Sequence, residues 1–105
     1  MAKSRYTISM DYTRAVEQAE RLEKLAGSLS AVANDSMNSC FSQIRSAWKG
    51  NSSDAYIQKG QKVQTDILKL SKNLRSAANT IRTVAKNTRD MELRALEIAQ
   101  SRTYK

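Results

Sequence analysis

The chain of 105 residues has no proline, no histidine, three glycines and one cysteine. Without proline, and with so few glycines, little in the composition interrupts a long helix. Without histidine, the commonest general base and metal ligand is missing, and a single cysteine forms neither an internal disulfide nor a zinc site with its neighbours. These absences argue against an enzyme, a metal-binding protein or a disulfide-stapled fold, and they imply no cofactor.

Large apolar features are also scarce. Aromatic residues make up 6% of the chain, and no apolar run approaches the ~20 residues that a membrane-spanning helix needs. We therefore expect no transmembrane segment and no large globular core. The N-terminal sequence is basic and has no apolar segment of the kind that a classical signal peptide contains.

What the chain does have is a helical repeat of apolar and small residues, spaced alternately by four and three positions. This spacing indicates one face of a helix that packs against another helix. After Ala33 the pattern shifts by one residue, which resembles a stutter in a coiled coil. The inner face of the first predicted helix comprises Ile8, Tyr12, Ala15, Ala19, Leu22, Ala26, Leu29, Ala33, Met37, Phe41, Ile44 and Trp48. The inner face of the second comprises Tyr56, Gly60, Val63, Ile67, Leu70, Leu74, Ala77, Ile81, Val84, Thr88, Met91, Ala95 and Ile98.

The two periodic halves are separated by the segment WKGNSSDAY, residues 48–56. Gly50 can end a helix in the left-handed conformation, and Asn51 or Ser52 can cap the next helix. Because the loop is short, the helices must run antiparallel. We therefore predict an all-α fold, a single helical hairpin over residues 1–105. Its first helix spans about 8–48, its turn 49–52 and its second helix about 53–101.

A hairpin of two helices buries only one stripe of each helix, so its core is thin. Several apolar side chains flank the predicted contact, and pairing two hairpins into a four-helix bundle would bury them. We therefore expect a dimer. The residues assigned to this partner interface are Val16, Leu25, Leu29, Val32, Leu68, Leu93 and Leu96. Cys40 lies on the inner side of the first predicted helix, where we expect a small buried thiol.

The central segment, together with the chain length and the helical pattern, resembles the WXG family, the ESAT-like early secreted antigens of type VII secretion. Members carry Trp-X-Gly in the turn of a helical hairpin, with an aromatic residue about eight positions after the Trp. Trp48, Gly50 and Tyr56 occupy these positions.

The resemblance implies a non-catalytic protein that a type VII (ESX-like) machine of a Gram-positive bacterium exports from the cytoplasm without a classical signal peptide. It also implies a homodimer, a heterodimer with another WXG-like protein, or a complex with a larger effector. In the family the Trp contributes to recognition by the secretion ATPase. Trp48 therefore either combines recognition with packing or only packs the end of the hairpin. The chain contains no Tyr-X-X-X-Asp/Glu element, the export signal of many members, so we expect a partner to supply that signal.

The net charge of +8 is unevenly distributed, because the segment 59–89 contains a single acidic residue, Asp66. The basic residues of this segment fall on outward positions of the second predicted helix. The basic stripe comprises Lys62, Lys69, Lys72, Arg75, Arg82, Lys86 and Arg89, with Lys59 preceding it. Such a stripe is a solvated face or a site for an acidic protein or anionic lipid. For nucleic acid, interleaved aromatic residues and a known motif are both missing. The alternative function is therefore an intracellular coiled-coil adaptor or a hairpin that binds an anionic surface.

Overall fold

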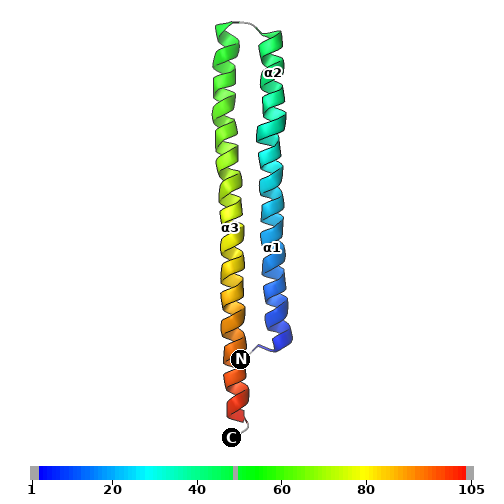
Figure 1. Cartoon of the computed structure of the whole chain (residues 1–105), viewed down its shortest axis with the longest axis vertical. Coiled ribbons are helices and arrows are strands. Elements are labelled where there is room, and N and C mark those ends of the chain that lie inside the picture. Colours follow the sequence, from blue (N-terminus) through cyan, green and yellow to red (C-terminus); the bar gives the residue numbers. More distant parts are fainter. Residues whose placement is uncertain (1–2, 49, 104–105) are drawn as a thin grey trace. The chain divides into compact units, whose positions relative to one another are not determined.

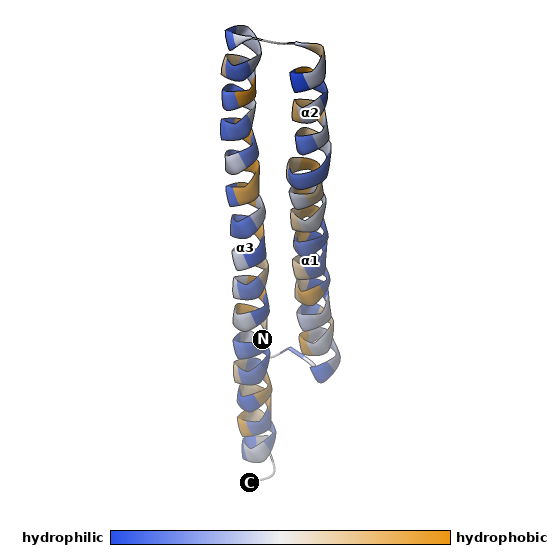
Figure 2. Ribbon diagram, turned by 45° about the horizontal axis from the view of Figure 1, so that its top comes forward, coloured by the Kyte–Doolittle hydropathy of each residue, from blue (hydrophilic) through white to orange (hydrophobic). Residues whose placement is uncertain are grey.

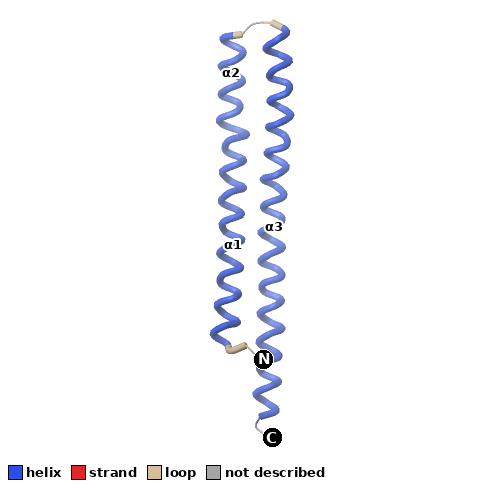
Figure 3. Tube along the Cα trace, turned by 180° about the vertical axis from the view of Figure 1, so that it is seen from behind, coloured by secondary structure: helices blue, strands red, loops and turns tan. Residues whose placement is uncertain are grey.

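The computed structural model describes residues 3–48 and 50–103, and these residues are helical apart from short loops (Figure 3). Four elements follow one another: α1 (Arg5–Ala31), a π-helical turn η1 (Val32–Ser36), α2 (Met37–Ala47) and α3 (Asn51–Thr103). The part of the chain that is described contains no strand. The predicted all-α class and the antiparallel hairpin are therefore confirmed.

The chain divides into two compact units, one formed by Met1–Leu22 with Ser76–Lys105 and the other by Glu23–Arg75. We call α1, η1 and α2 together the N-terminal arm, and α3 is the other arm of the hairpin. In each unit, a segment of α3 lies beside a segment of the N-terminal arm (Figure 1). The second unit also contains the turn between α2 and α3. Over the described residues, no helix has the length and apolar character needed to cross a membrane.

Helix α1 begins at Arg5 because Ser4 caps it. The Ser4 hydroxyl accepts a hydrogen bond from the Thr7 backbone N–H at 3.1 Å, and the Ser4 carbonyl accepts one from Ile8 N–H at 3.0 Å. The first bond satisfies one of the N–H groups that a helix N-terminus leaves without partners, and the second is the first i→i−4 bond of the helix. The apolar periodicity starts only at Ile8, so a prediction based on it placed the start of this helix later than the cap does.

The shift in the apolar pattern after Ala33 coincides with the π-helical turn. Across η1, the Met37 N–H donates to the Val32 carbonyl, an interval of five residues instead of the usual four. A π turn holds one more residue than an α-helical turn, so it absorbs the extra position in the repeat. As a result, Ala33 within the π turn and Phe41 after it are both buried.

Small and polar residues form the contact between the arms in the second unit. Ser71 is 1% exposed, and its hydroxyl donates to the Ala26 carbonyl oxygen at 2.7 Å. Seven residues closer to the turn between α2 and α3, the Gln64 amide donates to the Ala33 carbonyl oxygen and to Asn38 Oδ1. Ala26 and Ala33 are fully buried, and side chains this small let the opposing helix approach closely.

The predicted inner face of α3 is wrong at most of its positions, because only Gly60, Ile67, Leu74 and Ile81 are half-buried and the other positions are exposed. Ser53, Ile57, Ser71 and Ala78 are buried, whereas Tyr56 and Leu70, which directly precede Ile57 and Ser71, are about half exposed. The exposed large apolar side chains of α3 are Tyr56, Val63, Leu70, Val84, Met91 and Ile98, which are spaced by seven or multiples of seven. The prediction put the largest apolar side chains innermost, whereas alanine and serine occupy most of the buried positions, beside Ile8, Phe41 and Ile57. Two more predictions of burial on the N-terminal arm fail, because Cys40 and Trp48 are exposed.

Candidate functional site: the tryptophan turn and the exposed apolar face

The backbone around Trp48 ends α2 and starts α3. Trp48 has extended angles, φ −113° and ψ 119°, while its N–H still donates to the Ile44 carbonyl. Gly50 has φ +121°, a region that favours glycine, so the predicted positive φ is confirmed. Because α3 begins at Asn51, the capping position falls on Gly50 and the predicted caps, Asn51 and Ser52, already lie inside the helix. Lys49 lies outside the described residues.

The Trp48 ring is fixed on one side and open to solvent on the other. Its centroid lies 6.0 Å from that of Tyr56, and the two ring planes meet at 75° in an edge-to-face contact. Such a pair stabilises by about 0.5–1.5 kcal/mol beyond its buried area. Trp48 and Tyr56 nevertheless remain 56% and 57% exposed. The two rings border a hollow of about 310 Å³, which is lined by Cys40, Gln43, Ile44, Ala47, Trp48 and Tyr56.

The structure divides the predicted partner-interface residues into two groups. Leu25 and Val32 are 50% and 46% exposed. The others are half-buried: Val16, Leu29, Leu68, Leu93 and Leu96. The exposed large residues of α3 were missed as interface residues because they had been assigned to the inner face. Figure 2 shows hydrophobic residues interspersed with hydrophilic ones along α3.

The predicted basic stripe is exposed at five of its seven positions: Lys62, Lys69, Lys72, Arg75 and Lys86. Arg82 and Arg89 are partly buried. The Arg89 guanidinium carbon lies 4.2 Å from the centroid of the Tyr12 ring, and its Nε lies 3.3 Å from Asp90 Oδ1. Arg89 therefore holds α1 to α3 and is not a free surface cation.

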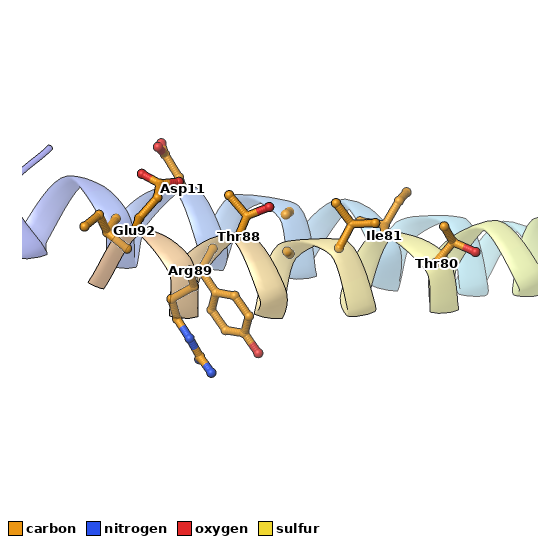
Figure 4. A pocket seen from close by; sticks show the side chains of 11 residues that line it. Asp11, Thr80, Ile81, Thr88, Arg89 and Glu92 are labelled. Carbon is orange, nitrogen blue, oxygen red and sulfur yellow. The ribbon is translucent and has the colours of Figure 1, made fainter. Parts of the chain in front are cut away.

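The first unit contains a second hollow, of about 330 Å³ (Figure 4). Its polar end is formed by Asp11 and Glu92, whose carboxylates lie 2.9 and 3.3 Å from the Lys3 ammonium. Hydrogen bonds to Asp11 and Glu92 raise the pKa of Lys3. Both acids are thus ion-paired, and among the described residues no group of three or more His, Cys, Asp and Glu side chains could hold a metal ion.

The fold and the turn define a small helical hairpin protein that presents an exposed tryptophan at its turn. A model of the WXG100 family, proteins of 100 residues with WXG, matches residues 7–92, and the chain belongs to this family. The family is associated with type VII secretion substrates, and its members are small secreted helical proteins that are not known as enzymes. Comparisons with curated proteins and with solved structures give no match.

Proposed function

We propose that the chain is an exported substrate, or a co-secreted partner, of a type VII (ESX-like) secretion machine and that it acts by binding. The observation that carries this proposal is the exposed, oriented Trp48 at the turn of a WXG100 hairpin. Membership of the family supports the pathway, and the placement of Trp48 supports its role as the surface that the machine contacts.

Trp48 has the properties of a binding residue that is organised before its partner arrives. The backbone hydrogen bond to Ile44 and the edge contact with Tyr56 restrict the indole ring, while more than half of its surface stays in water. A large aromatic side chain held in this way loses little conformational entropy on binding and gains the free energy of burying its open face. We therefore assign the contact with the secretion ATPase to Trp48, whose ring Tyr56 supports.

The second part of the proposal concerns a helical partner, either another hairpin or the helical domain of an effector. Exposed large apolar side chains recur along α3 at intervals of seven or fourteen residues, and a seven-residue repeat of apolar side chains is what helix-on-helix packing requires. The hairpin itself leaves these side chains in water, and covering them would remove apolar surface from solvent at about 25 cal/mol per Å².

Export from a bacterium with a working type VII system tests the proposal. Trp48→Ala is expected to lower the amount of protein in the culture supernatant about tenfold, with the cell-associated pool and the helical content kept. The matched control is Tyr6→Ala, because Tyr6 is an aromatic residue that is 74% exposed and lies far from the turn in sequence. Normal export of Trp48→Ala, or equal loss in both variants, would contradict a specific role for Trp48.

A further inference from the structure

The second unit carries an apolar face to which both arms contribute. Two contacts fix how the arms are aligned: Ser71 bonds to the Ala26 carbonyl, and Gln64 bonds to the Ala33 carbonyl. Leu70 directly precedes Ser71 in the sequence, and Leu25 directly precedes Ala26. In the same way, Val63 precedes Gln64 and Val32 precedes Ala33.

Antiparallel helices are related by a two-fold axis normal to the plane that contains them. The residue before each contact residue therefore lies on the same side of the hairpin in both arms. Leu25, Val32, Val63 and Leu70 thus share one side, and Tyr56, seven residues before Val63, extends it toward the turn. All five are exposed by 46–57%. We call this set the apolar face.

The α3 edge of the apolar face is basic. Lys59, Lys62 and Lys69 are exposed and lie one to four positions from Val63 or Leu70, and one acid, Asp66, lies among them. On a helix, positions three and four residues apart are neighbours, so these lysines flank Val63 and Leu70. A helix packed along the apolar face would place its own flanking residues against these lysines.

A second copy of the chain offers no acidic row to match this edge. Glu23 is the one acid of α1 in this unit, and because it precedes Ala26 by three residues it lies on the opposite side of the contact from Leu25. Two copies joined through the apolar face would therefore bring lysine edges together or set them against uncharged residues. Repulsion between like charges would weaken such a homodimer, whereas attraction between the lysines and acidic side chains would stabilise a complex with an acidic partner.

We propose that the occupant of the apolar face is a helix of a different protein whose flanking positions are acidic, and that this chain is the basic half of a heterodimer. The inference rests on the proposed function, because it names the kind of partner that the exported hairpin binds. The apolar residues supply the attraction, and the lysine edge selects the acidic partner over a second copy.

A charge-reversed copy of the chain serves as the probe. The variant Lys59→Glu, Lys62→Glu, Lys69→Glu keeps the apolar face and gives it an acidic edge. The control Lys72→Glu, Arg75→Glu, Lys86→Glu has the same net charge, but its exposed substitutions lie away from the apolar face, and Lys86 belongs to the first unit. Lys72 and Arg75 follow Ser71 and Leu74, whereas Leu70 precedes Ser71, so these two residues lie on the other side of α3 from the apolar face. Native mass spectrometry and sedimentation equilibrium, under reducing conditions that keep Cys40 as a thiol, measure each pairing.

We expect the wild-type chain to bind the edge variant at least about tenfold more tightly than it binds itself or the control, with the advantage shrinking as salt is added. Adding Leu70→Glu to the wild-type chain should abolish the complex. A stable wild-type homodimer that the edge variant does not outcompete would overturn the acidic partner and leave the secretion role of the hairpin standing. No association in any mixture would overturn binding at this face, whereas the export of Trp48→Ala is a separate test of the proposed function.

Discussion

The contact between Gly60 and Phe41 gives a direct test of how closely the two arms pack. Gly60 lies in α3, and the Phe41 ring of α2 is 5% exposed. A Cβ atom added to Gly60 would lie 2.5 Å from Phe41 Cε1 and 2.9 Å from Phe41 Cζ. Carbon atoms in ordinary contact are about 3.5–4.0 Å apart, so Gly60→Ala requires a shift of about 1 Å.

The expected change in stability combines two opposing terms. Overpacking a core position costs about 1–3 kcal/mol, while replacing glycine by alanine inside a helix gains about 0.5–1 kcal/mol. Gly27→Ala provides the matched control, because Gly27 lies inside α1 and an added Cβ would meet nothing within 4 Å. The gain in helix propensity is common to both variants. Their difference in unfolding free energy, about 1–3 kcal/mol, therefore reports the clash with Phe41 alone.

The assay is urea and thermal unfolding followed by circular dichroism, with all variants at one protein concentration because a dimer would make the midpoint concentration-dependent. A difference of 1 kcal/mol corresponds to about 4–8 °C in Tm for a chain of roughly this size. Placing Phe41→Leu in the Gly60→Ala background should relieve the clash, so the two substitutions should show a coupling energy of about 1 kcal/mol or more. If Gly60→Ala stabilises the protein as much as Gly27→Ala does, the close contact between the arms is refuted.

Two further predictions concern the contact between the arms and the π turn. Ser71→Ala removes the hydrogen bonds to Ala26 and Ser30 and should lower the free energy of unfolding in urea by about 1 kcal/mol. The control is Ser76→Ala, because Ser76 is exposed. Equal unfolding free energies for the two variants would contradict this prediction. Deleting Asp35 should convert η1 into a regular α-helical turn and leave a cooperatively folded hairpin, because the extra residue is what the π turn absorbs. Deleting Arg21 from the middle of α1 should instead rotate one part of the arm by about 100° against the other and cause a large loss of Tm; similar Tm values for the two deletions would argue against this role of the π turn.

Several features of the fold could be predicted from the sequence because they depend on local pattern. The apolar repeat and the absence of proline predicted two helical arms, and glycine beside small polar residues located the break at Gly50. The one-residue shift after Ala33 was visible as a stutter, although the sequence did not show that a π turn would absorb it. The cap at Ser4 was missed, although serine is among the residues preferred at a helix N-cap.

The register of α3 could not be predicted from hydrophobicity alone. Two adjacent stripes compete for the inner position, one of large apolar residues such as Leu70 and one of small or polar residues such as Ser71. The choice depends on the opposing arm, where Ala26 and Ala33 leave room for close approach and offer backbone carbonyls to Ser71 and Gln64. That information is long-range, and it also explains why the exposed apolar face was missed. The exposure of Trp48 follows from the extended backbone at the turn, which a helical repeat does not describe.

The central claim is that the secretion machine contacts Trp48, and the tryptophan itself can report that contact. Trp48 is the only tryptophan of the chain, so incorporating 5-fluorotryptophan gives one fluorine signal that an unlabelled secretion ATPase does not obscure. Titration with the ATPase domain should shift or broaden that signal and protect it from a soluble paramagnetic quencher, since binding would bury the open face of the indole. If the ATPase binds the chain while the Trp48 signal keeps its position, width and accessibility, Trp48 is not the contact and the account is wrong.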